Sequence, residues 1–364
     1  MKIGIVTSHH WALPSKLHLG DVCVLDLATA LHQLGHEVVM FAPEGTEAPA
    51  KLCVMQSAQG SGTPSAYECE VGCYREHLSE LWSCDIVHDM SQDKNVSELL
   101  FRDGRPVLQT LFGGRWLSAN PPRNLCVPSE SHRARVLRGQ TDYVDTPTPD
   151  LAGPNGPGIS EAHVVYLGVD TEFYCPGDAP KGSHWLWLGR WHPVRGYKMA
   201  IDVARATGIE LVMSGENPSY MRWEAEKACA AEAVALARGL PNVRFEYLPP
   251  DPDHHTAKRE QYRRAKALLL TTQFHEPFGL QQVEAAACGT PIMSTAFGSM
   301  PELGLSTVSQ RNDPLIFSHL IGCLRGFSHT YTDTRAAAVG RFDRSVMARN
   351  YLHEYRSVIG GMRW

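Results

Sequence analysis

The sequence predicts an α/β protein made of two doubly wound, Rossmann-like domains that face each other across a cleft. Three observations support this prediction. The chain has 364 residues, and a chain of that length usually forms two domains of about 150 to 200 residues. Apolar segments of strand length alternate with segments of helical periodicity, which is typical of parallel sheets. A linker-like segment rich in glycine and proline, at residues 175–183, divides the alternation into two series.

The composition is that of a globular protein, with 43% hydrophobic and 20% charged residues. No stretch approaches the roughly 18 to 20 apolar residues of a membrane span, and the opening MKIGIVTS is typical of a strand and not of a signal peptide. We therefore expect a cytoplasmic protein. The net charge of −5 argues against a general nucleic-acid binder. The closest cysteine pair, Cys69 and Cys73, has no second pair of ligands to complete a zinc site.

The first series opens with a buried strand at residues 2–7, a helix at 21–34 and a second strand at 36–42. Apolar residues at helical spacing predict the helix, and Gly35 ends it. Residues 44–65 are rich in Gly, Pro, Ser and Ala and are predicted to form a loop. The remaining strands of this series are predicted at residues 85–90, 106–111, 124–128 and 163–169, with a helix at 130–137.

The second series begins with a strand at residues 185–189. Its other strands are predicted at residues 209–214, 243–248, 268–272 and 291–295. Helices are predicted at residues 199–206, 221–239, 256–267, 280–288 and 314–325, followed by one amphipathic stretch at 334–359. The two series predict a first domain at residues 1–170, a second at 171–335 and a terminal segment at 336–364.

The segment from His275 to Glu302, HEPFGLQQVEAAACGTPIMSTAFGSMPE, joins a loop, a short helix and a strand. Its loop follows a strand end, where open α/β sheets bind ligands. Glu276 lies in the loop and Glu284, eight positions later, in the helix. The helix start offers free N–H groups and a partial positive charge, which suit a phosphate. The segment predicts a sugar-nucleotide site; the alternative is an ordinary solvated helix start with Glu284 in a salt bridge.

Glu276 to Glu284 matches the E-x7-E motif, in its EPFGL form, of retaining glycosyltransferases with the GT-B fold. With the Gly-Thr-Pro and Pro-Glu that follow, the segment resembles family-4 enzymes, which include glycogen-synthase relatives and bacterial sugar transferases. The phrase GHEV at residues 35–38 and the turn GVDTEF at 168–173 resemble the same family. The resemblance implies a terminal helix, within residues 336–364, that packs back on the first domain.

The resemblance also implies roles for residues of the second domain. Arg190 and Arg195 would clamp the diphosphate of the donor, with Arg195 in the place of the family's lysine. Glu276 would hold hydroxyls of the sugar, and Glu284 those of the ribose. Backbone groups of three further residues would approach the sugar and the phosphates, namely Phe278, Gly279 and Leu280.

The first domain departs from the family at two places. Gly20 matches the glycine of a loop under the donor phosphates, but Asp21 replaces the second glycine; it would be a helix N-cap or lie near the acceptor hydroxyl. Phe112 stands where relatives often have a histidine that binds the 6-hydroxyl of the donor sugar. Because a phenyl ring cannot hydrogen-bond a hydroxyl, we expect a deoxysugar or pentose donor, or a shifted contact from His9 or His10.

Two other features of the first domain have open interpretations. His88 lies where the family often has an H-x-H phrase and is a candidate sugar or acceptor contact, although a lone strand histidine is more often structural. Several arginines could face an anionic acceptor or a membrane surface, although a solvated face is the commoner explanation. These arginines are Arg115, Arg123, Arg133, Arg135 and Arg138.

Together, these observations predict a glycosyltransferase that transfers a sugar from a nucleotide-diphosphate donor to an acceptor hydroxyl with retention. No metal and no cofactor is expected, because the arginines and the helix start would offset the charge of the leaving diphosphate. The acceptor could be a small molecule, a glycan or a lipid-linked sugar, and nucleic acid is not expected. Two alternatives remain: an enzyme like the sugar-nucleotide 2-epimerases, and a catalytically silent protein that binds nucleotide sugars.

Overall fold

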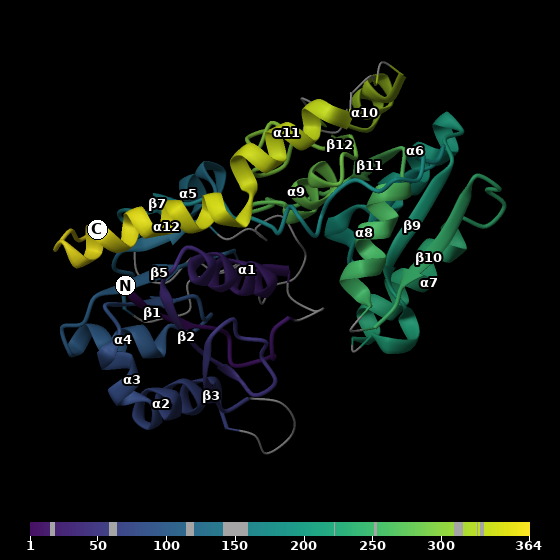
Figure 1. The fold of residues 1–364 in the computed structure, drawn as a ribbon. Coiled ribbons are helices and arrows are strands. Elements are labelled where there is room, and N and C mark those ends of the chain that lie inside the picture. Colours follow the sequence, from purple (N-terminus) through teal and green to yellow (C-terminus); the bar gives the residue numbers. More distant parts are fainter. Residues whose placement is uncertain are drawn as a thin grey trace. The chain divides into compact units, whose positions relative to one another are not determined.

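The chain forms two compact units (Figure 1). The computed structural model describes residues 1–14, 19–57, 64–113, 120–140, 159–221, 223–250, 253–308, 316–325, 327 and 331–364. Unit 1 comprises Met1–Val169 together with Asp343–Trp364, and unit 2 comprises Asp170–Phe342. Each unit is built around its own parallel sheet.

The sheet of unit 1 has, among the described residues, the strand order β3-β2-β1-β4-β5-β6-β7, with all neighbours parallel. Its strands are β1 (Lys2–Val6), β2 (Glu37–Pro43), β3 (Lys51–Met55), β4 (Ile86–Asp89), β5 (Val107–Thr110), β6 (Leu125–Val127) and β7 (His163–Val164). The chain builds the sheet outward from β1 to β3 and then returns to the other side of β1 with β4. The topological switch point, where such sheets bind ligands, therefore lies at the carboxyl ends of β1 and β4.

Helices cover both faces of this sheet. They are α1 (Leu19–Gln33), α2 (Ala66–Glu76), α3 (Leu78–Ser83), α4 (Asn95–Arg102), α5 (Glu130–Leu137) and α12 (Arg344–Ile359). Figure 1 shows α12 beside α1 on one face, with α2, α3 and α4 on the other. Ser65 and Glu68 form a capping box that starts α2. Apolar side chains beneath α2 to α4 form one core cluster, including Phe41, Leu81 and Leu100.

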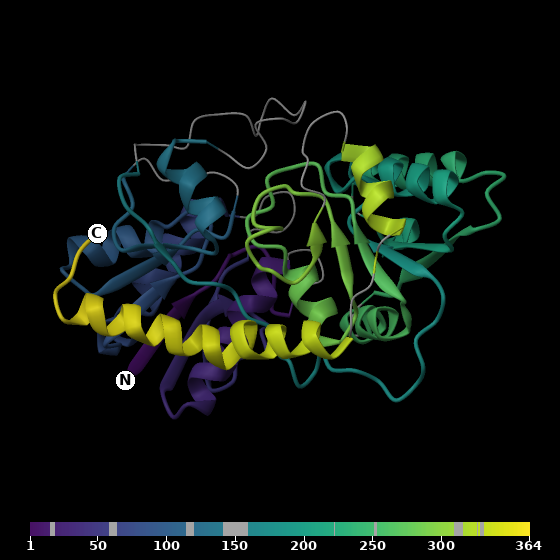
Figure 2. The same cartoon turned by 90° about the horizontal axis from the view of Figure 1, so that it is seen from above.

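Unit 2 has the strand order β10-β9-β8-β11-β12-β13 among its described residues, again all parallel. The strands are β8 (Trp185–Leu188), β9 (Leu211–Glu216), β10 (Val243–Leu248), β11 (Ala267–Leu270), β12 (Ile292–Ser294) and β13 (Thr307–Val308). The helices are α6 (Tyr197–Thr207), α7 (Glu224–Leu236), α8 (His254–Arg264), α9 (Leu280–Ala287), α10 (Ile316–Arg325) and α11 (Tyr331–Phe342). Figure 2 shows α6, α7 and α10 on one face of the sheet and α8, α9 and α11 on the other. The two parallel sheets confirm the predicted α/β class.

Some predicted elements differ from the structure. Residues 44–65 are not a loop throughout, because β3 lies within them and extends the sheet beside β2. The predicted strand at 163–169 forms ladder pairs only at β7. The amphipathic stretch at 334–359 is two helices, α11 and α12. They separate at Asp343, whose side chain accepts a hydrogen bond from the backbone N–H of Ser345 and caps α12.

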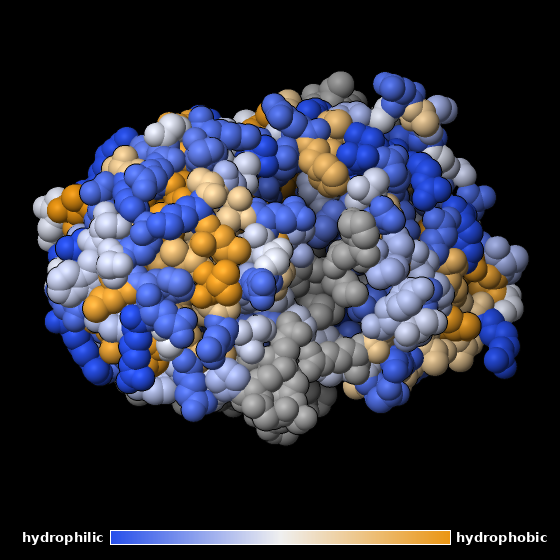
Figure 3. Space-filling model, turned by 60° about the horizontal axis from the view of Figure 1, so that its bottom comes forward, coloured by the Kyte–Doolittle hydropathy of each residue, from blue (hydrophilic) through white to orange (hydrophobic). Residues whose placement is uncertain are grey.

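The described surface is mixed in polarity. In the face that Figure 3 shows, hydrophilic residues cover most of the area, and hydrophobic residues form separate smaller areas. Among the described residues, none of the helices combines the length and the apolar character that crossing a bilayer requires. Arg115, one of the arginines predicted to make a basic face, lies outside the described residues.

Candidate functional site

The candidate site of unit 2 lies where two loops leave adjacent strands. β8 and β11 are neighbours in the sheet and mark its topological switch point. The loop after β8 contains a single 3-10 turn, Pro193–Arg195, and the loop after β11 contains the EPFG motif. The backbone N–H of Gln273 donates to the carbonyl oxygen of Val194 at 2.7 Å and ties the two loops together. Side chains from both loops therefore converge.

Arg195 and Glu276, both predicted as site residues, form an ion pair in this place. Nη1 of Arg195 donates to Oε2 of Glu276 at 2.7 Å. The two side chains are 21% and 13% exposed, so the pair is partly screened from water while a ligand can still reach it. The Arg195 guanidinium also lies 4.8 Å from the ring centroid of Phe274. Because a guanidinium carries five N–H donors, Arg195 can hold Glu276 and still donate to a phosphate.

Two glycines let the loops of this site pack tightly against neighbouring backbone. Gly298 has a φ of +65°, and a Cβ there would lie 2.2 Å from the carbonyl oxygen of Glu276. The next residue, Ser299, donates its N–H to the same carbonyl at 2.9 Å. Gly196 has a φ of +74°, and a Cβ on it would lie 1.8 Å from the carbonyl oxygen of Thr271. Side chains larger than hydrogen at either position would push the loops apart.

The start of α9 lies directly after the EPFG motif. Gly279 is its N-cap, with a φ of 82°, and Leu280 is its first residue. Gly279 has no side-chain hydrogen bond to cap the helix, so the first N–H groups of α9 are suited to an anion. Phe278 is buried, and its ring packs edge-on against that of Phe342. That backbone groups of 278–280 approach the ligand stays a prediction.

The second carboxylate of the motif, Glu284, is held inside unit 2. Its Oε1 accepts a hydrogen bond from Nζ of Lys258 at 2.7 Å, and its Oε2 accepts one from the hydroxyl of Tyr262 at 3.0 Å. Lys258 and Glu284 are almost completely buried. Burial and the adjacent carboxylate raise the pKa of Tyr262 well above its usual value, so that its hydroxyl remains a donor. Lys258 and Tyr262 thus fix both oxygens of Glu284.

Arg190 lies at the other end of the loop after β8 and has a different partner. Its Nε is 3.4 Å from Oε1 of Glu226 on α7, and the Arg190 side chain is 42% exposed. Burial raises the pKa of Glu226, an effect that Arg190 opposes. Burial and the two neighbouring arginines lower the pKa of His192, which lies between Arg190 and Arg195 in the sequence. The loop therefore presents its positive charge through the two arginines.

In unit 1, three predicted site residues lie differently from the expectation. α1 begins at Leu19, so Gly20 and Asp21 lie in its first turn, and Asp21 is not the N-cap. Their side chains lie outside the described part of the structure. His88 is fully buried, with Nδ1 2.8 Å from the Tyr355 hydroxyl and Nε2 2.7 Å from Oγ1 of Thr110. Its two ring nitrogens are engaged within unit 1, and it is a structural histidine and not a sugar contact.

The other predicted residues of unit 1 lie at strand ends. Phe112 is half-buried and follows β5 by two residues. His10 is half-buried, and its carbonyl oxygen accepts a hydrogen bond from the Ser57 hydroxyl. His9 is fully buried and lies near two carboxylates, Glu70 and Asp93.

Sequence reasoning missed three residues that shape the site of unit 2. Lys258 and Tyr262 are four residues apart on α8 and so share one helix face. A lysine and a tyrosine on the core side of a predicted helix could have indicated a buried carboxylate partner. Gly298 follows a predicted strand in the phrase AFGS, but the sequence alone does not show that it faces Glu276.

Comparison with known proteins shows which families the chain resembles. Residues 180–308 match the family described as "Glycosyl transferases group 1", and this range includes both arginines and both glutamates. The chain is 30% identical over 223 residues to a D-inositol 3-phosphate glycosyltransferase of Frankia alni, covering 54% of this chain and 53% of that protein. The chain thus spans about half the length of this curated relative.

Solved structures agree with the fold. AviGT4, a glycosyltransferase involved in avilamycin A biosynthesis, superposes with a TM-score of 0.66 at 19% identity, covering 100% of this chain and 99% of that chain. Anabaena HepE, solved in complex with UDP and glucose, superposes with a TM-score of 0.67 at 16% identity. The match covers 97% of this chain and 99% of that chain. Fold and site together define the class of GT-B proteins. Within that class, residues 180–308 are similar to the group 1 glycosyltransferases, and about half of the chain is similar to the curated relative.

Proposed function

We propose that the chain transfers a sugar from a nucleoside-diphosphate sugar to an acceptor hydroxyl with retention of the anomeric configuration. The observation that carries the proposal is the pairing of Arg195 with Glu276 at the switch point of unit 2, beside the start of α9. A diphosphate needs fixed positive charge, and a sugar needs hydrogen-bond acceptors for its hydroxyls. This place supplies both.

Charge develops on the leaving diphosphate as the glycosidic bond breaks. Arg195 and the first N–H groups of α9 would stabilise that charge, and Arg190 would add a second cation. We infer that these groups replace a metal ion at the diphosphate. Glu276 would accept hydrogen bonds from the sugar while its pairing with Arg195 keeps the carboxylate oriented.

Glu284 would hold the ribose, with Lys258 and Tyr262 as its supports. Each carboxylate oxygen has two lone pairs, so Glu284 can accept from both neighbours and still accept a hydroxyl. Such supporting groups fix the rotamer of the residue that contacts the ligand. The acceptor hydroxyl would attack on the face that the diphosphate leaves, as the resemblance implies for retaining enzymes.

The neighbours suggest where to begin the search for substrates. HepE binds UDP and glucose, and the Frankia alni relative is named for D-inositol 3-phosphate. We propose UDP-sugars as the first donors to test, with deoxysugar and pentose donors included because Phe112 replaces a hydroxyl-binding histidine. The ten cysteines are free thiols, which suits the reducing cytoplasm where nucleotide sugars are found.

One assay separates the proposal from its two alternatives. The release of nucleoside diphosphate is measured for each donor with and without candidate acceptors, D-inositol 3-phosphate among them, and the product is analysed by NMR. A transferase releases nucleotide only as a new glycoside forms, and the product keeps the donor's anomeric configuration. Release without any acceptor, together with an altered free sugar, would indicate the epimerase-like reaction. Donor binding without release in all mixtures would indicate a silent binding protein.

A further inference from the structure

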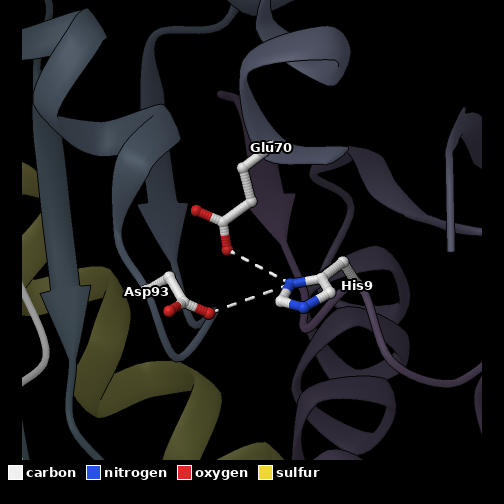
Figure 4. Close-up of side chains that lie close together, drawn as sticks. All are labelled: His9, Glu70 and Asp93. Atoms are coloured by element: carbon white, nitrogen blue, oxygen red, sulfur yellow. Dashed lines mark ion pairs between the residues drawn. The ribbon is translucent and has the colours of Figure 1, made fainter. Parts of the chain in front are cut away.

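A second cluster of chemically active side chains lies in unit 1 and shares no residue with the diphosphate clamp of unit 2. It consists of His9 from the loop after β1, Glu70 from α2 and Asp93 from the loop after β4 (Figure 4). Because β1 and β4 are the adjacent strands at the topological switch point of this sheet, the cluster lies where an open α/β sheet places a ligand. Residues far apart in the sequence thus meet at one predictable position.

The three side chains point at one another. Nδ1 of His9 lies 3.6 Å from Oε1 of Glu70 and 3.9 Å from Oδ2 of Asp93. Figure 4 shows both carboxylates directed toward this ring nitrogen of His9. These separations are longer than hydrogen bonds, and one ligand atom from each residue lies within 4.8 Å of the others. In a tetrahedral site with bonds of about 2.1 Å, the ligand atoms lie about 3.4 Å apart, so the spacing suits an ion among them.

Three buried polar atoms of this cluster lack hydrogen-bond partners among the described residues. His9 and Glu70 are fully buried, and neither ring nitrogen of His9 nor Oε1 of Glu70 has a hydrogen bond there. Leaving such atoms unsatisfied is costly, and a bound cation would satisfy Nδ1 of His9 and Oε1 of Glu70 together.

The other oxygen of Glu70 is held by hydrogen bonds, like the non-ligating oxygen of a metal-binding carboxylate. Its Oε2 accepts hydrogen bonds from the backbone N–H of Asn95 at 2.8 Å and from Nδ2 of Asn95 at 3.0 Å. This leaves Oε1 directed at His9. Hydrogen bonds to the non-ligating atom orient metal-binding carboxylates in the same way. Asp93 is 26% exposed on its side chain, which gives an ion a path to the cluster.

We propose that His9, Glu70 and Asp93 bind a divalent transition-metal ion that ties together the loops after β1 and β4 and helix α2. One imidazole nitrogen and two carboxylate oxygens favour Zn²⁺, Co²⁺ or Mn²⁺ over Mg²⁺ and Ca²⁺, which prefer oxygen ligands alone. The two carboxylates supply two negative charges that a divalent ion balances. None of these three ligands belongs to the diphosphate clamp, whose residues are part of unit 2.

The test uses the full chain without a polyhistidine tag, stripped with a chelator and then dialysed against Zn²⁺ or Co²⁺. The proposal expects about one equivalent of metal per chain by elemental analysis, a visible absorption band for bound Co²⁺ and a higher melting temperature with Zn²⁺. Asp93→Asn is expected to weaken binding at least tenfold and to lose the thermal shift. Its partly exposed side chain allows the variant to fold, which circular dichroism of the stripped protein would verify. Asp178→Asn, an equal loss of charge at an exposed position of unit 2, is expected to bind like the wild type.

Three results would overturn the proposal. The first is a wild-type chain that retains no metal, in which case the cluster is a buried arrangement of one histidine and two carboxylates without an ion. The second is equal metal binding by Asp93→Asn and the wild type, which would place the ion elsewhere. The third is tight binding of Mg²⁺ with no preference for Zn²⁺. X-ray absorption at the zinc edge adds an independent check, because the proposal requires imidazole scattering from a single histidine.

Discussion

Arg195 and Glu276 are joined by a 2.7 Å hydrogen bond between ionised side chains although 81 residues separate them in the sequence. The two residues come from the loops that leave β8 and β11, and the sheet topology makes those strands neighbours. The charges are partly buried, where their attraction is less screened than at the surface. The pair therefore preorganises a cation and a hydrogen-bond acceptor side by side before any substrate arrives.

Replacing Arg195 tests whether this pair serves catalysis. Arg195→Ala is expected to lower kcat/KM for sugar transfer about 10²- to 10³-fold, because it removes a fixed cation from the leaving diphosphate. Arg195→Lys should retain more activity, since it keeps the charge but loses the fork of donors. Steady-state kinetics with an active donor provide the measurement. Arg205→Ala, at an exposed position of α6, is the matched control and should behave like the wild type. If Arg195→Ala kept more than half of kcat/KM, the diphosphate role would be wrong.

A substitution of Lys258 tests whether its buried ion pair with Glu284 stabilises unit 2. Lys258→Met should destabilise unit 2 by about 3 to 5 kcal/mol, because it leaves a carboxylate buried without its cation. Adding Glu284→Gln should recover much of that loss, since the double variant no longer buries an unpaired charge. Urea unfolding of the single and double variants measures both effects, and Lys266→Met at an exposed position is the control. Equal destabilisation by Lys258→Met and Lys266→Met would contradict the buried pair's role.

Phe112 tests the nature of the donor sugar. Phe112→His restores a side chain that can hydrogen-bond a hydroxyl, and should raise kcat/KM for a 6-hydroxyl hexose relative to its 6-deoxy analogue by about tenfold. Phe112→Leu keeps an apolar surface and should leave the ratio unchanged. Competition between the two donors in one reaction gives the ratio directly. A wild-type enzyme that already prefers the 6-hydroxyl donor strongly, with no change in Phe112→His, would exclude this role.

The sequence was most informative about features that local pattern and sheet topology determine. Two doubly wound sheets follow from the alternation of strand and helix segments, and the E-x7-E segment locates Glu276 at a strand end. Long-range partners were harder to predict. Lys258 reaches Glu284 only because α8 packs against α9, and Gly298 matters only because a distant loop folds over the backbone of Glu276.

The errors have the same origin. His88 matched a family phrase, but its environment depends on the docking of α12, 267 residues further on at Tyr355. β3 was missed because its five residues, KLCVM, lie in a stretch that is otherwise rich in Gly, Pro, Ser and Ala, and only the pairing with β2 identifies them as a strand. The break at Asp343 was missed because the helical pattern continues across it, while the residue itself is an N-cap and pairs with Val169.

His88 also predicts how unit 1 responds to acid. Burial lowers the pKa of His88 well below its ordinary value, with a further contribution from the nearby Lys94. In the unfolded chain the same imidazole titrates near pH 6.5, so below that pH the unfolded state binds a proton that the folded state does not. The contribution of His88 to the free energy of unfolding is therefore complete above about pH 6.5. Below that pH it declines by up to about 1.4 kcal/mol per pH unit.

Urea midpoints measured from pH 7.5 to 5 should therefore fall more steeply for the wild type than for His88→Gln. The glutamine side chain does not titrate, although the variant is expected to be less stable at pH 7.5 because Tyr355 and Thr110 lose ideal partners. His353→Gln, at an exposed position of α12, should keep the wild-type slope. Parallel curves for the wild type and His88→Gln would show that His88 is not a group on which the acid sensitivity depends.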